Sequence, residues 1–128
     1  MAKNAHPERL IQNAILQWLK WQKDCVVMEI DTQGIYNRRT KTFIAKQQNA
    51  GACFFRGVSD ILVLHKHFGF IAIEVKSAVG RLSDVQLDFK SAVLANGGRF
   101  LLARSVDDVQ GFFESEAAKR APKITVDK

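Results

Sequence analysis

The stretch Gly57-Val-Ser-Asp-Ile-Leu-Val-Leu-His-Lys-His-Phe-Gly-Phe-Ile-Ala-Ile-Glu-Val-Lys76 decides the fold of this chain. Two apolar runs, residues 61–64 and 68–73, flank a short polar turn that contains Gly69. Apolar runs of this length around a glycine-containing turn are typical of a β-hairpin whose strands are largely buried. The sequence therefore predicts a buried hairpin over residues 59–77.

Ionisable residues lie at the open end of this hairpin. Side chains alternate across a strand, so Glu74 and Lys76 point to one face and Val75 to the other. The end of the second strand lies beside the start of the first, which makes Asp60 and Glu74 neighbours. Two converging carboxylates favour a hard cation such as Mg²⁺ or Mn²⁺, and the Val75 carbonyl adds a third oxygen. The alternative is a surface salt bridge between Glu74 and Lys76.

The same residues resemble the core of the PD-(D/E)XK nucleases. Gly57-Val-Ser-Asp60, an apolar strand and then Ile73-Glu-Val-Lys76 carry the resemblance. The continuation Arg81-Leu-Ser-Asp-Val-Gln86 is similar to one branch, the VRR-NUC domain, in which a helix with a glutamine follows Glu-Val-Lys. The resemblance covers residues 6–105. One departure is Ser59, which stands where the family usually has proline before the aspartate.

The resemblance implies metal-dependent hydrolysis of phosphodiester bonds by a DNA endonuclease. Asp60 and Glu74 would bind Mg²⁺ or Mn²⁺, and Lys76 would act beside the metal, either on the water or on the developing charge. In this branch a glutamate of the first helix also reaches the metal site, and Glu8 matches it. Without the resemblance, Glu8 is an exposed residue that complements the helix dipole.

Gln86 has two candidate roles. Ser83 and Gln86 have the spacing of a capping box, in which the glutamine side chain folds back onto the start of its own helix. The resemblance instead implies that Gln86 points toward the Lys76 side of the site. The sequence leaves both roles open.

Positive charge gathers just ahead of the hairpin. The chain carries a formal net charge of +6, and residues 32–57 contain no aspartate or glutamate. We expect the basic residues of this region, and one at the entry to the next helix, to bind DNA phosphates: Arg38, Arg39, Lys41, Lys46, Arg56 and Arg81. A solvated basic loop is the alternative.

The resemblance also bears on partners. Stand-alone VRR-NUC proteins of this length are associated with phages and bacteria, and look like homodimers that act on branched DNA such as four-way junctions, whereas longer relatives cut flaps. We expect the last helix to bury Val106, Val109, Phe112 and Phe113. An exposed Phe112-Phe113 or Trp18-Trp21 pair would be the place to look for a dimer surface.

Two other classes compete with this interpretation. A DNA-binding protein that has lost catalysis would usually lack an acid or the lysine, yet Asp60, Glu74 and Lys76 are all present. A metal-independent RNA-processing relative would need a histidine-based acid–base pair. His65 and His67 lie in the hairpin turn, away from the carboxylates.

Composition sets further limits. At 128 residues and 47% apolar content, the chain is predicted to form one soluble domain over residues 1–128, with a core at 6–105 and a C-terminal helix and tail at 106–128. We expect neither a membrane span nor a signal peptide. Cys25 and Cys53 are expected to be free thiols, which suits the cytoplasm of a bacterium or a phage-infected host.

The predicted fold class is α/β, with a mixed central sheet flanked by helices in the order α-β-β-β-α-β-α, as in restriction endonucleases. Outside the hairpin we expect a helix at 7–23, strands at 25–30, 52–55 and 100–103, a loop at 33–52 with one helical turn around 42–48, a helix between Ser83 and Asn96, a last helix after Ser105, and a loose tail at 117–128.

Overall fold

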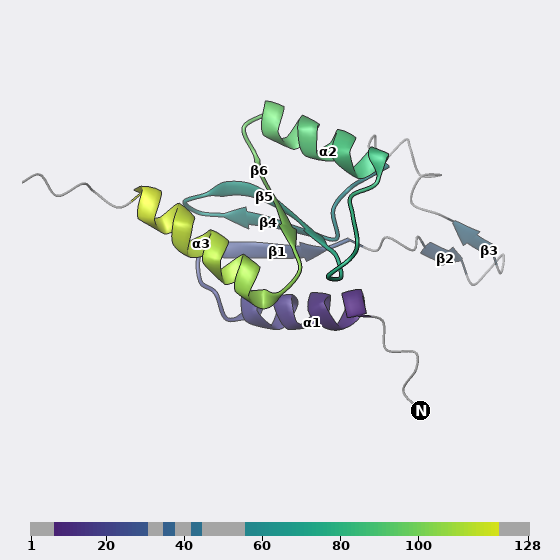
Figure 1. Ribbon diagram of the computed structural model, residues 1–128, viewed down its shortest axis with the longest axis horizontal. Coiled ribbons are helices and arrows are strands. Elements are labelled where there is room, and N and C mark those ends of the chain that lie inside the picture. Colours follow the sequence, from purple (N-terminus) through teal and green to yellow (C-terminus); the bar gives the residue numbers. More distant parts are fainter. Residues whose placement is uncertain (1–6, 31–34, 38–41, 45–55, 121–128) are drawn as a thin grey trace, which may run out of the picture.

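The computed structural model describes residues 7–30, 35–37, 42–44 and 56–120, and it confirms an α/β fold (Figure 1). Its main sheet has the strand order β1 (Cys25–Glu29), β4 (Ile61–His65), β5 (Gly69–Val75) and β6 (Arg99–Ala103). The first three strands pair antiparallel, so the predicted hairpin is confirmed as β4 and β5. β5 and β6 are parallel and are joined through α2 (Asp84–Ala95), because a parallel pair requires a crossover connection.

The segment predicted as a loop contains two short strands. β2 (Ile35–Asn37) and β3 (Thr42–Ile44) pair antiparallel and form a separate two-stranded sheet. The predicted helical turn around 42–48 is therefore wrong at residues 42–44, where threonine, phenylalanine and isoleucine favour an extended backbone. The strand predicted at 52–55 lies outside the described residues.

The helix boundaries differ from the prediction at two ends. α1 (Pro7–Lys20) stops three residues before the predicted end at residue 23. α3 (Val106–Arg120) runs past residue 117, so the first part of the predicted tail is helical. Within the described ranges, no helix is long and apolar enough to cross a membrane.

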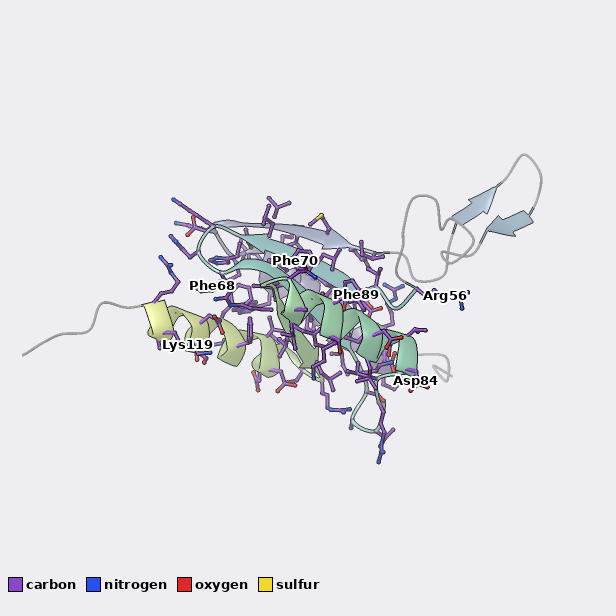
Figure 2. All side chains as sticks on the ribbon, turned by 90° about the horizontal axis from the view of Figure 1, so that it is seen from above. Arg56, Phe68, Phe70, Asp84, Phe89 and Lys119 are labelled. Atoms are coloured by element: carbon purple, nitrogen blue, oxygen red, sulfur yellow. The ribbon has the colours of Figure 1, made fainter. Side chains whose placement is uncertain are left out.

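Helices cover the two faces of the sheet unequally. α1 and α3 lie on one side and α2 on the other (Figure 1). The α1 and α3 side holds the larger core, in which side chains such as Ile61, Ile71 and Ile73 are fully buried and contribute about 1.5–3 kcal/mol each. On the other side, Phe89 of α2 packs over β5 near Phe70 (Figure 2).

The aromatic residues proposed for a dimer surface belong mostly to this core. Phe113 is buried, and its ring makes an edge contact with Trp18, with 5.3 Å between the ring centroids. The predicted burial of Phe113 in the last helix is therefore confirmed, and Phe112-Phe113 is not an exposed pair. Trp21, just after α1, is exposed.

A buried charged residue holds α3 to the sheet. Glu116 is 6% exposed, and its carboxylate accepts hydrogen bonds from Arg99 Nε at 2.6 Å and from Lys119 Nζ at 3.2 Å. Arg99 also donates to the Phe68 carbonyl at the hairpin turn. Burial alone would raise the pKa of Glu116, but the hydrogen bonds and charges of Arg99 and Lys119 outweigh burial and lower it.

We predict that Glu116→Gln destabilises the fold by about 1–3 kcal/mol at neutral pH, because the charged pair is lost. A lowered pKa in the folded state adds stability above the unfolded-state pKa of about 4.3, and this stability is lost as the pH falls through the folded pKa. The variant should therefore lose less stability than the wild type on acidification below about pH 5. Urea unfolding followed by tryptophan fluorescence measures both effects.

Glu114→Gln, an exposed position on the same helix, is the matched control and should change stability by less than about 0.5 kcal/mol. Equal pH profiles for wild type and Glu116→Gln would show that the pair adds no stability.

Candidate active site

The open end of the hairpin brings Asp60 and Glu74 together. The pairing of Ile61 with Ile73 continues by one step to place Asp60 opposite Glu74. The backbone amide of Val75 donates to Asp60 Oδ2 at 3.0 Å. On the other side, the Ile30 amide donates to the Asp60 carbonyl at 2.8 Å. Strands on both sides of β4 therefore fix the position of this aspartate.

Glu74 is an acidic side chain in a buried position. It is 3% exposed and lies on the face of the sheet that α2 covers. Its Oε2 accepts a hydrogen bond from Gln86 Nε2 at 3.0 Å. A buried carboxylate is costly unless polar groups or a cation compensate for its lost hydration. Glu74 is thus a costly residue for a merely structural role.

Gln86 closes the capping box that its spacing from Ser83 predicts, and the same side chain also reaches Glu74. The side-chain Oε1 of Gln86 accepts a hydrogen bond from the Ser83 backbone amide at 2.8 Å. The backbone amide of Gln86 donates to Ser83 Oγ at 3.3 Å, which completes the capping box. Its Nε2 meanwhile donates to Glu74. The two roles are compatible because a glutamine amide has separate acceptor and donor ends. The helix cap therefore aims the donor at the carboxylate.

Gly57 permits the approach of α2 to the hairpin. A Cβ atom at this position would stand 2.1 Å from the Val85 carbonyl oxygen and 2.6 Å from the Gln86 amide nitrogen. Both atoms belong to helix backbone, which cannot rotate away as a side chain can. Only glycine fits here, so the glycine of the Gly-x-x-Asp pattern positions Gln86.

We predict that Gly57→Ala displaces the first turn of α2 and weakens the Gln86–Glu74 contact. The expected result is a loss of about 2–4 kcal/mol in stability, because backbone must move to relieve the overlap. Thermal unfolding measures the loss. Gly111→Ala is the control, since a Cβ there meets nothing within 4 Å, and it should be neutral or stabilising. Equal melting temperatures for the two variants would contradict the packing.

Lys76 and Glu8 meet around Gly80. A Cβ at Gly80 would lie 3.3 Å from Lys76 Cδ and 3.4 Å from Glu8 Oε2. The loop after β5 runs down to the first turn of α1, which carries Glu8 (Figure 1). Glu8 is exposed, and Lys76 is half-buried. The first turn of α1 therefore borders the same end of the sheet as Asp60 and Glu74.

Arg104 also lies at this end, and no sequence motif pointed to it. Its guanidinium donates to the carbonyls of Ser77 at 2.5 Å and Gly80 at 2.9 Å, and so holds the loop that follows Lys76. The Lys76 amide donates to the Ala103 carbonyl at 3.0 Å. In the sequence, Arg104 stands out only as a basic residue at the end of β6. The parallel register of β5 and β6 sets this position beside Lys76.

The predicted phosphate-binding residues divide into two groups. Arg56 and Arg81 are exposed at the end of the sheet where α2 begins, and Figure 2 shows Arg56 at the same end as Asp84. Arg38, Arg39, Lys41 and Lys46 lie outside the described residues.

His65 and His67 lie at the other end of the hairpin. The ring of His65 is buried and stacks on Phe68, with 4.0 Å between centroids. Its Nδ1 accepts from the backbone amides of His67 and Phe68 at 3.0 and 3.3 Å. Burial, aided by the nearby His67, lowers the pKa of His65. His65 is therefore a packing residue at the end of the hairpin away from Asp60 and Glu74.

Few of the described side chains at the open end of the hairpin could bind a metal ion. Within the ranges that the structure describes, no group of three or more His, Cys, Asp or Glu side chains is close enough to hold a metal ion. The residues that converge are Asp60 and Glu74, with the backbone of Val75 beside them. The candidate ligand atoms are the carboxylate oxygens of Asp60 and Glu74 and the carbonyl oxygen of Val75. A small set of oxygen ligands suits Mg²⁺ or Mn²⁺, which keep several bound waters. The residues present fit such an ion.

A mixed sheet whose hairpin ends in Asp60 and Glu-Val-Lys, capped by a helix that bears Gln86, is consistent with a restriction-endonuclease-like nuclease. The VRR-NUC domain model matches residues 6–107, which is 102 of the 128 residues. The chain belongs to the VRR-NUC family, and it is accordingly a nuclease domain. No curated protein and no solved structure matches it.

Proposed function

We propose that this protein is a metal-dependent DNA endonuclease that hydrolyses phosphodiester bonds, with branched DNA such as four-way junctions as its substrate. The observation that carries the proposal is the convergence of Asp60 with a buried Glu74 that Gln86 holds in place. Glu74 lies two residues before Lys76 in the chain, with Val75 between them.

The chain's own residues prepare the site. Asp60 and Glu74 would hold Mg²⁺ or Mn²⁺ together with the Val75 carbonyl, and Glu8 is the candidate for a further ligand. When bound, the ion would lower the pKa of a coordinated water and stabilise charge on the scissile phosphate. The backbone amide of Val75 orients the Asp60 carboxylate, and the side-chain amide of Gln86 orients the Glu74 carboxylate. Neither carboxylate therefore depends on the ion for its position.

Lys76 supplies the remaining positive charge at the reaction centre. It would orient or deprotonate the attacking water, or stabilise the negative charge that develops on the phosphate. Arg104 keeps the loop after Lys76 in place and so acts as a positioning residue.

The surroundings favour a polyanion. The first turns of α1 and α2 both border this end of the sheet, and helix N-termini attract phosphate groups. Arg56 and Arg81 are exposed there, and the net charge of +6 favours DNA. We propose that a homodimer, acting in the cytoplasm of a bacterium or a phage-infected host, presents two such sites to the two strands of a junction.

We predict that wild-type protein cuts a four-way junction in Mg²⁺ or Mn²⁺, and that Glu74→Ala or Lys76→Ala reduces the rate by at least about a thousandfold. Lys76→Ala should leave DNA affinity nearly unchanged, since one phosphate contact among many is lost. Gel-based cleavage of junction, flap and linear duplex, with binding measured in Ca²⁺, separates the two effects. Lys66→Ala, exposed at the far end of the hairpin, is the matched control.

Cutting of flaps or single-strand ends alone would keep the nuclease and discard the junction preference. Tight binding without any cutting would favour a non-catalytic DNA-binding protein that retains the fold. Full cleavage by Lys76→Ala would show that the site is wrongly assigned.

We predict that replacing Arg38 and Arg39 by alanine weakens DNA binding and lowers the slope of log K against log salt by about 1–2. The reason is that each lost phosphate contact releases about one counterion fewer. Fluorescence anisotropy over a range of salt concentrations measures the slope. An unchanged slope would show that this segment does not touch the DNA backbone.

A further inference from the structure

The main sheet ends at β1, and no described strand pairs with its outer side. The face of the sheet next to this edge also carries apolar side chains in contact with solvent. Val26 is 59% exposed, Met28 39% and Leu64 54%. The register sets Val26 beside Leu64 and Met28 beside Leu62, so these residues share one face. The apolar cluster beneath α2 includes residues of β5 and β6 and Leu62 of β4, but no residue of β1.

Two hydrogen bonds show which backbone groups of β1 point outward. The Lys66 amide donates to the Asp24 carbonyl, and the Ile30 amide donates to the Asp60 carbonyl. Each bond joins residues that the register sets opposite one another, so the even-numbered residues of β1 direct their backbone groups toward β4. The amides and carbonyls of Cys25, Val27 and Glu29 therefore point away from the sheet.

We propose that β1 pairs antiparallel with β1 of a second copy of this chain, about a two-fold axis at Val27, to form a continuous eight-stranded sheet. Val27 then exchanges two hydrogen bonds with Val27 of the second copy, and Cys25 exchanges two with Glu29 of the second copy. The outward groups of all three residues are paired. An open, apolar edge strand is otherwise a site of uncontrolled association.

The side chains on the exposed face are complementary under this symmetry. The axis sets Val26 opposite Met28 of the second copy, and Met28 opposite its Val26. Leu64 lies next to Val26 in each copy, so the two apolar patches merge into one strip. This strip crosses the boundary between the two β1 strands, which we call the seam. The same contacts are made twice, as a two-fold interface requires.

This inference rests on the proposed two-site nuclease, and it adds the surface that joins the two copies. Asp60 lies level with Ile30, three residues from the axis. The two sites would therefore lie about 20 Å apart along the strand direction, at opposite ends of the seam, given about 3.4 Å per residue.

The test is the mass of the full chain in solution, by light scattering or sedimentation, which does not depend on cleavage. The wild type should have a mass of twice 14.4 kDa. Val26→Lys with Met28→Lys sets like charges opposite each other and should give monomers. Val26→Lys with Met28→Glu sets opposite charges across the seam and should restore the dimer in a salt-sensitive form. Leu94→Lys, exposed on α2, is the control and should remain dimeric.

A monomeric wild type overturns the proposal, and so does a dimer that survives Val26→Lys with Met28→Lys. Failure of the Lys–Glu pair to restore the dimer overturns the register at Val27. Far-ultraviolet circular dichroism confirms that each variant is folded.

A second measurement tests the register without added charge. In the proposed seam, residue 26 of one copy and residue 28 of the other form a non-hydrogen-bonded pair with Cα atoms about 4.5 Å apart, close enough for a disulfide. Val26→Cys with Met28→Cys should give a covalent dimer on a non-reducing gel, and Leu94→Cys should not. No covalent dimer from the first variant overturns the register. A dimer that cuts no DNA would contradict the proposed function while leaving the seam intact.

Discussion

The hydrogen bond from the Gln86 amide to the buried Glu74 carboxylate is the contact on which the site depends. It joins α2 to β5, and the capping box that starts α2 fixes the direction of the donor. A solvent-exposed glutamate would be free to rotate, whereas Glu74 is 3% exposed and held at one oxygen. The capping box of α2 thus fixes the position of the Glu74 carboxylate.

Backbone contacts surround this hydrogen bond and make it possible. Gly57 lets the first turn of α2 approach the hairpin closely, because any Cβ there would overlap the helix backbone. On the other side, Arg104 holds two carbonyls of the loop after Lys76. Contacts from neighbouring elements therefore hold the two carboxylates and the backbone at Lys76, at the end of the sheet where two helices begin. Such preorganisation is what electrostatic catalysis needs, because the groups do not reorganise during the reaction.

The sequence indicated some of this arrangement and missed other parts for physical reasons. Alternation along the strands and the glycine-containing turn predicted the hairpin and the meeting of Asp60 with Glu74. The spacing of Ser83 and Gln86 predicted a cap, but not that one side chain would also reach the sheet. Arg104 could not be linked to Ser77 and Gly80, since 24–27 residues separate them along the chain. The sequence placed Phe113 on the buried face of the last helix, and the packing of α3 confirms this.

By itself, the sequence determined the fold class, the family motif and the residues with acidic or basic chemistry, because these depend on local periodicity and on side-chain type. Only the tertiary structure decided which groups meet. It joined Gln86 to Glu74, brought Glu8 and Lys76 to Gly80, and left β1 as an edge with Val26 and Met28 in contact with solvent. These contacts depend on how helices pack across the complete sheet. A local sequence pattern does not encode contacts between residues that lie far apart in the chain.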